Sequence, residues 1–245
     1  MPLTLSHPAA VLPLGRLGLP MTVLVIASMT PDLPLYLGWR GGYEITHSPL
    51  GIVTMDIVLG VGVVAFWTFV MRDALVDASP APVRRRLPAR ARLARREWAL
   101  APVAACLAAV THVAWDGFTH VGWWGHDRVA WLRTDHAGVS GVTWSQYVSG
   151  VVGLAVVLTA AAVCLRGREP IDGPRAPRIL PAPTLAIVVA LAGLVAVVSA
   201  VGRIPSGFDS MAFHGVVNGL ITLAVGLLAM TLAWHVLARS GRRPR

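Results

Sequence analysis

One short stretch of the sequence combines histidines and a carboxylate at helical spacing. His112, Asp116 and His120 recur at intervals of four residues, at the end of an apolar run that begins at Trp98. Residues four apart on a helix lie on the same face, one turn above each other. Imidazole nitrogens and carboxylate oxygens are ligands for zinc, and catalytic zinc sites use about three protein ligands plus a water. The spacing therefore predicts a metal site.

Helix geometry favours His112 and Asp116 as ligands of a single ion, because they lie one turn apart. His112 and His120 are two turns apart, about 11–12 Å along an ideal helix, and cannot share an ion. If Gly117 ends the helix after Asp116, His120 is free for a second ion or for substrate. The same ligand types suit manganese or iron. The sequence therefore predicts a divalent metal ion, with zinc as the preferred candidate and manganese or iron as alternatives.

The composition places these residues in a membrane protein. The chain has 245 residues, of which 55% are hydrophobic and only 13% charged, against about 25% charged in a typical soluble domain. In a soluble protein the net charge of +9 would suggest nucleic acid. Here the arginines lie between apolar runs, so the positive-inside rule accounts for them and we expect no nucleic-acid partner. Cys106 and Cys164 lie inside apolar runs, which indicates neither a disulfide framework nor a thiolate metal site.

Several apolar runs approach the roughly 20 residues that a membrane-spanning helix needs. We predict an all-α, multi-pass bundle in a single membrane domain, residues 1–245, surrounded by the lipid of the cytoplasmic membrane, with the oligomeric state left open. Its five full spans are expected at residues 50–71, 98–115, 144–165, 184–201 and 211–237.

The loops between these spans alternate in charge. Loop 72–97 is rich in arginine and is expected in the cytoplasm, as are loop 166–178 and the basic tail 239–245. Loop 117–143 then lies outside. Its tryptophans, with Trp115 and Trp144 beside them, are expected to form an interfacial belt rather than a substrate platform.

The N-terminal apolar residues form two short pieces. Residues 2–14 and 21–29 are each too short to cross a bilayer alone, and the glycines and prolines of 15–20 separate them. We expect a kinked or re-entrant helical hairpin. A hairpin would bring His7 to the outer side, whereas a single kinked span would leave it in the cytoplasm.

This topology brings polar residues from distant segments to one membrane face. His112 lies one turn deeper, and Asp56 is within reach of the same leaflet. An aspartate at the bilayer centre costs about 2.5–3.5 kcal/mol, so such residues are functional-site candidates by default. The residues expected near the outer face are Asp32, His47, Asp116, His120 and His126.

Four segments of the sequence resemble the uncharacterised membrane family DUF4184. They are also similar, more distantly, to the YdjM-like (DUF457) bacterial inner-membrane proteins described as membrane-bound metal-dependent hydrolases. That group has an N-terminal His, a Pro-Asp pair, a Thr-His-Ser and a His-x-x-x-Asp helix. The matching segments are Leu5-Ser6-His7-Pro8-Ala9, Ser28-Met29-Thr30-Pro31-Asp32, Thr46-His47-Ser48 and the run from Thr111 to His120.

The resemblance covers the first half of the chain with specific motifs and the second half only by hydropathy. It implies a polar metal site made of His7, Asp32, His47, His112 and Asp116. Asp32 and Asp116 are then the candidate catalytic carboxylates, as ligand or general base, and His120, His126 and Asp56 are candidates for substrate or a second ion. We predict that the five metal-site residues converge within one pocket.

The sequence departs from the YdjM-like pattern at two places. That group tends to have a second acid in the Pro-Asp motif and an Arg just before the Thr-His-Ser. Here those places hold Pro34 and neighbours such as Glu44 and Ile45. The departure favours a site that holds one ion, or one that has lost activity.

Two classes of function fit these observations. The first is a membrane-embedded metal-dependent hydrolase near the outer face, acting on lipid or lipid-linked phosphoesters, in which a bound ion activates water. The second is a transporter or channel for metal ions or protons, for which the short N-terminal halves would form a broken helix. The absence of an internal repeat and the clustering near one face weigh against the second. A catalytically inactive membrane protein is the third reading.

Overall fold

The structure, a computed structural model, describes residues 3–173 and 175–241. The predicted all-α class is confirmed, because the strands among these residues are the short antiparallel pair β1 (Asp135–His136) and β2 (Val139–Ser140). The predicted basic tail 239–245 lies outside the described residues from position 242 onward.

Five helical runs of the described chain are long and apolar enough to cross a membrane, as predicted. The first, 55–78, consists of α6 (Met55–Phe66), a π-helical turn (Trp67–Met71) and α7 (Arg72–Ala78). The other four are α9 (Arg95–Thr119), α12 (Gly141–Arg166), α13 (Thr184–Val201) and α14 (Phe208–Ser240).

The predicted boundaries of the first span and of two loops were wrong. The first span begins at Met55 rather than Leu50, because the backbone leaves the helical region at Thr54 and the preceding residues form a separate short helix, α5 (Pro49–Val53). Loop 72–97 is shorter, because it contains α7, α8 (Ala81–Arg86) and the start of α9. Loop 117–143 is likewise shorter, because α9 continues to Thr119 and α12 begins at Gly141.

The N-terminal segment, for which a kinked or re-entrant helical hairpin was predicted, is a chain of short helices. It contains α1 (Pro8–Val11), a 3-10 helix (Leu12–Leu17) and α2 (Met21–Ala27), with the turn between the last two at Gly18, whose φ is +75°. A second 3-10 turn (Thr30–Asp32), α3 (Leu33–Tyr36) and α4 (Arg40–Thr46) follow. Each piece is shorter than the roughly 20 residues that span a bilayer.

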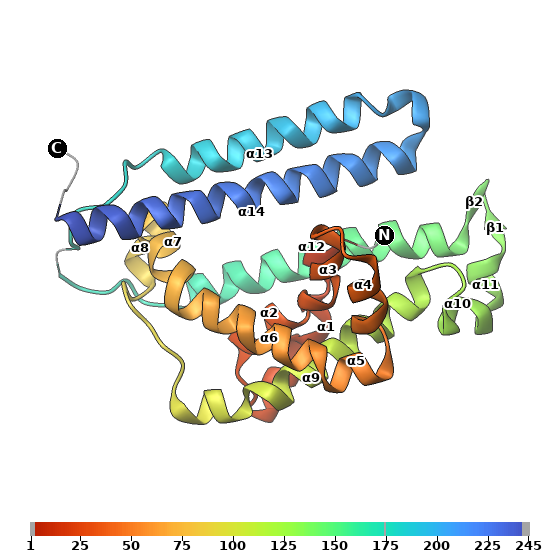
Figure 1. The fold of residues 1–245 in the computed structure, drawn as a ribbon, viewed down its shortest axis with the longest axis horizontal. Coiled ribbons are helices and arrows are strands. Elements are labelled where there is room, and N and C mark those ends of the chain that lie inside the picture. Colours follow the sequence, from red (N-terminus) through yellow and green to blue (C-terminus); the bar gives the residue numbers. More distant parts are fainter. Residues whose placement is uncertain (1–2, 174, 242–245) are drawn as a thin grey trace. The chain divides into compact units, whose positions relative to one another are not determined.

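The chain forms two compact units, of which the first comprises Met1–Ala65 and Leu93–Cys164. In this unit α2 packs along α9, with α1 against both (Figure 1). Small side chains make the contact close, because α9 presents alanines, among them Ala104 and Ala108, to the buried Val23 and Leu24 of α2. Gly60 of α6 fits the same interface, since a Cβ there would lie 3.0 Å from Ala27 Cβ and 3.1 Å from Ala105 Cβ.

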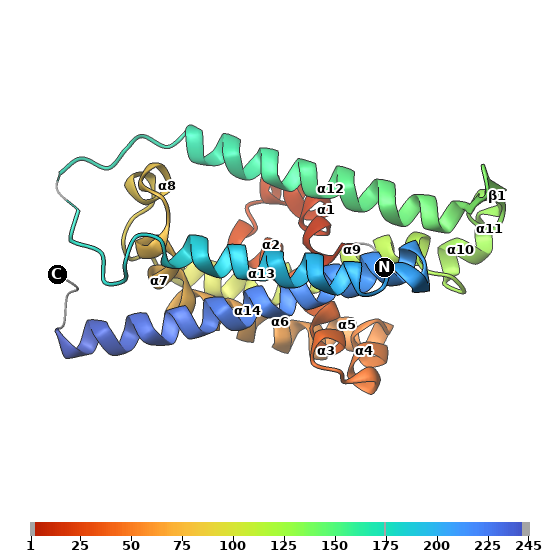
Figure 2. The same ribbon diagram turned by 90° about the horizontal axis from the view of Figure 1, so that it is seen from above.

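The second unit comprises Phe66–Arg92 and Leu165–Arg245. Figures 1 and 2 show α13 and α14 as an antiparallel pair, joined through the 3-10 turn Ile204–Ser206. The basic loops of this unit fold around the Asp77 carboxylate. It accepts hydrogen bonds from the Arg84 guanidinium (2.8 Å), the Ile179 main-chain N–H (2.9 Å) and the Trp234 indole (3.0 Å).

Replacing Gly60 by valine should destabilise the first unit, because the new side chain would meet two Cβ atoms at about 3 Å. Overpacking of this kind typically costs about 1–3 kcal/mol. Gly62→Val is the matched control, since a Cβ at Gly62 of the same helix would have no described atom within 4 Å. Thermal unfolding in detergent should show a lower midpoint for Gly60→Val alone. Equal midpoints would contradict the described packing of α6.

Candidate metal centre

Four polar side chains from three separate segments meet inside the first unit. Asp32 ends the 3-10 turn before α3, His47 caps the C-terminus of α4, and His112 and Asp116 lie one turn apart on α9. One ligand atom from each lies within 4.8 Å of all the others. Their side chains are between 0% and 3% exposed.

The distances between these atoms fit coordination of one small cation. His47 Nε2 lies 3.3 Å from His112 Nε2, 3.7 Å from Asp32 Oδ1 and 3.4 Å from Asp116 Oδ2. His112 Nε2 lies 3.5 Å from the same Asp32 oxygen and 3.4 Å from the same Asp116 oxygen. Ligands about 2.0–2.1 Å from a tetrahedral zinc ion stand about 3.3–3.4 Å apart. Five of the six pairs among the four atoms therefore have nearly the spacing of a zinc shell.

Main-chain carbonyls fix the tautomers of both histidines. His112 Nδ1 donates to Ser28 O at 2.7 Å, and His47 Nδ1 donates to Tyr43 O at 2.9 Å, since a carbonyl can only accept. In the neutral rings the two Nε2 lone pairs therefore face each other, with two carboxylate oxygens beside them. Such a concentration of acceptors requires a cation, either a metal ion or a proton. Outer hydrogen bonds of this kind are typical of metal-binding histidines.

A hydroxyl chain holds the Asp32 carboxylate. Thr4 Oγ1 donates to Asp32 Oδ2 at 2.5 Å, and the Tyr36 hydroxyl, 2.7 Å from Thr4 Oγ1, must then donate to Thr4. Burial raises the pKa of Tyr36 to about 12, so its hydroxyl keeps its proton at neutral pH. Asp32 Oδ1 has no hydrogen-bond partner in the described part of the chain and faces the centre.

His7 lies directly against this centre, as the resemblance implied. Its ring stacks on His112 with 3.8 Å between centroids, and its Nε2 lies 3.5 Å from Asp116 Oδ1. Neither ring nitrogen has a hydrogen-bond partner among residues 3–173 and 175–241. Burial, with the neighbouring His112, lowers the pKa of His7 to about 3, which keeps the ring neutral. The five residues that were expected to converge therefore lie together around one centre.

The three other predicted residues lie in different settings. His120 is next to the centre, with Nδ1 3.2 Å from Asp116 O and 3.7 Å from Asp116 Oδ1. His126 lies in α10 (Trp124–Arg128) and pairs instead with Asp127 at 3.0 Å. Asp56 is fully buried on α6, and its carboxylate has no hydrogen-bond partner within the described ranges.

The expectation that Gly117 could end the helix was wrong, because α9 continues to Thr119. The glycine serves packing instead. A Cβ at Gly117 would lie 2.4 Å from the Trp124 indole nitrogen, so only a glycine lets α10 fold back on α9.

A cavity of about 640 Å³ lies beside the centre and is lined by one of its four residues, His47. The Trp123 ring stands edge-on to the His47 ring at 5.5 Å. The hydroxyls of Thr4 and Tyr36 were not predicted from the sequence, although each residue is three or four positions from a predicted site residue, His7 or Asp32. The lining residues are Leu35, Arg40, Tyr43, Glu44, His47, Gly122 and Trp123.

Comparison with known proteins gives a family but no activity. No curated protein sequence and no solved structure matches this chain. The more distant YdjM-like similarity stays a prediction. The family model described as a domain of unknown function, DUF4184, matches residues 1–236, far beyond the first-half motifs that predicted it. The chain therefore belongs to the DUF4184 family.

Proposed function

We propose that one divalent transition-metal ion, with zinc as the preferred candidate, binds to Asp32, His47, His112 and Asp116. The observation that carries the proposal is the pair of Nε2 atoms held 3.3 Å apart by carbonyl-bonded Nδ1 groups, with an aspartate oxygen within 3.7 Å of each. Two nitrogens and two carboxylate oxygens suit zinc, and manganese or iron use the same ligand types.

We further propose that the protein is a metal-dependent hydrolase of lipid or lipid-linked phosphoesters. A bound zinc ion would supply an activated water with a pKa near 7 and would polarise the scissile group. Neighbouring residues would hold the ligands of the ion in place. The hydroxyl chain from Tyr36 through Thr4 orients Asp32, and the stacked His7 ring fixes His112. The cavity that His47 lines would receive the substrate group.

The charge pattern supports a site on the outer side of the cytoplasmic membrane. With all five candidate spans crossing the membrane, the loop after α7, the loop after α12 and the C-terminal end of α14 would share one side. That side carries the arginine clusters and is proposed as cytoplasmic. His112 and Asp116 lie in the last turns of α9, at the opposite end of that span.

Purified protein should contain about one zinc ion per chain, because the four ligand atoms lie within 4.8 Å of one another, around one centre. His112→Ala and Asp116→Ala should each lose the ion while keeping a normal elution profile in detergent. His214→Ala is the control, since His214 Nδ1 bonds to Ser210 O on its own helix. Elemental analysis of the purified variants measures the result. No stoichiometric metal in the wild type, or retention by the double variant His112→Ala/Asp116→Ala, would overturn the proposal.

Hydrolysis should depend on the bound ion. Phosphate release from a panel of lipid phosphoesters in vesicles should stop after chelation and return when zinc is added. Asp32→Asn should lose activity even at saturating zinc, because Oδ1 would no longer bear a full charge toward the centre. Uptake of zinc into sealed proteoliposomes without any hydrolysis would favour the transporter instead. A loaded protein that does neither would indicate an inactive family member.

Labelling of single cysteines should report the proposed orientation. In a variant without Cys106 and Cys164, cysteines at Leu5 and Val121, both exposed, should react with a membrane-impermeant reagent in intact cells. A cysteine at Ala91, in the arginine-rich loop, should react only after permeabilisation. If Leu5→Cys behaves like Ala91→Cys, the N-terminal segment is not on the outer side.

A further inference from the structure

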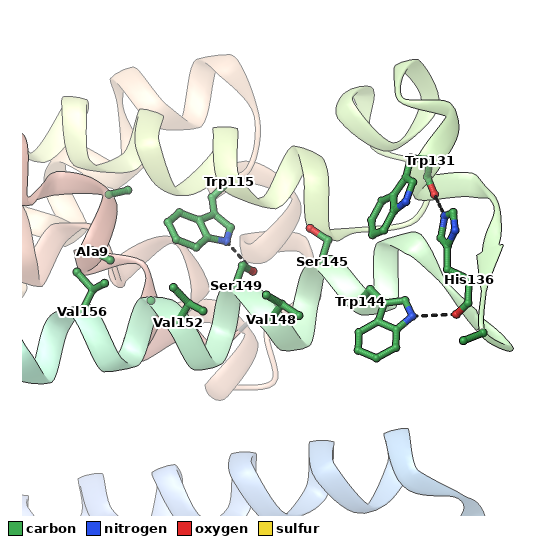
Figure 3. A pocket seen from close by; sticks show the side chains of 13 residues that line it. Ala9, Trp115, Trp131, His136, Trp144, Ser145, Val148, Ser149, Val152 and Val156 are labelled. Atoms are coloured by element: carbon green, nitrogen blue, oxygen red, sulfur yellow. Dashed lines mark hydrogen bonds between the residues drawn. The ribbon is translucent and has the colours of Figure 1, made fainter.

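A second cavity, of about 840 Å³, lies in the first unit beside the metal centre but contains none of its four ligands. It is a groove along one face of α12, closed by α1, by Trp115 of α9 and by the loop around β1 and β2 (Figure 3). Among the described residues that line it, His136 alone has an ionisable side chain.

Two rows of side chains on α12 shape the groove. Val148, Val152 and Val156 form one row at four-residue spacing, and the first two are 52% and 54% exposed. The other row is small: Ser145, Ser149 and Gly153. At Gly153 a Cβ would lie 2.7 Å from Ser6 Cβ, so the glycine allows the N-terminal segment to close the groove there.

The loop end of the groove is polar and aromatic. His136 stacks on Trp131 with 4.4 Å between ring centroids, and its Nε2 bonds to Trp131 O at 2.9 Å (Figure 3). The Trp144 indole donates to His136 O at 3.0 Å. Tryptophan indoles gather at the membrane–water interface because one edge is polar and the rest apolar. The groove therefore runs from an interfacial end at Trp144 to an apolar end at Val156.

The length of the groove matches one leaflet. From Trp144 to Val156, α12 rises about 18 Å at 1.5 Å per residue. Half of a hydrocarbon core of roughly 30 Å is about 15 Å. We propose that the groove binds one acyl chain of a bilayer phospholipid, with the headgroup beside Trp131, His136 and Trp144 and the chain along the valine row.

Trp115 connects this lipid site with the metal centre. Its indole Nε1 donates to Ser149 Oγ at 3.2 Å in the groove, and its ring lies 5.7 Å from the His7 ring. The Trp115 indole would thus separate a bound acyl chain from the His7 ring at the metal centre. The lipid site does not require the proposed activity, and chelation of the metal should leave it intact.

Photolabelling in nanodiscs tests the site. The probe is phosphatidylglycerol with a photoactivatable diazirine on one acyl chain, and the labelled positions are mapped by peptide mass spectrometry. Labels should concentrate on residues 144–156 of α12 and on Ala9 and Ala10. Val152→Trp should fill the groove and lose this labelling. Val151→Trp is the matched control, since Val151 is 71% exposed and does not line the groove.

Each outcome decides the proposal. Loss of labelling in Val152→Trp but not in Val151→Trp, with equal thermal unfolding midpoints, supports it. Labelling spread evenly along the lipid-facing positions of α12, or unchanged in Val152→Trp, would mean ordinary boundary lipid and would overturn it.

Discussion

The rings of His47 and His112 point their Nε2 lone pairs at each other, because each Nδ1–H is held by a main-chain carbonyl. Those carbonyls belong to residues 43 and 28, in separate short helical segments, so the centre depends on how the N-terminal helices end. Each terminus leaves carbonyls without intrahelical partners. Ser28 O, just after α2, thus serves as an acceptor for His112, whereas Tyr43 O accepts both the His47 ring and the His47 main-chain N–H.

Small side chains allow a polar centre to exist next to an apolar helix pair. The alanines of α9 and Gly60 of α6 let α2 approach closely, and the same contact brings Ser28 O to His112. In lipid, association of helices relies on such close packing, because the surrounding chains are as apolar as the side chains. The polar groups of the centre are therefore enclosed by closely packed helices.

The five spans could be predicted because each is a long apolar run in the sequence. The five converging polar residues could be predicted because a polar side chain in lipid is costly unless it finds a partner. The tautomers could not be predicted, since the carbonyls that fix them carry no side-chain signal. Gly117 was misjudged for a similar reason: its partner, Trp124, is brought close only by the fold. The groove on α12 is closed partly by Ala9 and Ala10, which are far from α12 in the sequence, so no local pattern could reveal it.

The hydrogen bonds of Asp77 have a consequence for the order of assembly. Arg84 is translated soon after this aspartate, but the Ile179 N–H and the Trp234 indole come much later in the chain. Until those segments are made, Arg84 is the only one of these three donors that can reach the carboxylate. Arg84, in the arginine-rich segment that follows α7, is thus the first of these three partners to be synthesised. A chain that ended before residue 234 would lack the hydrogen bond from the Trp234 indole to the Asp77 carboxylate.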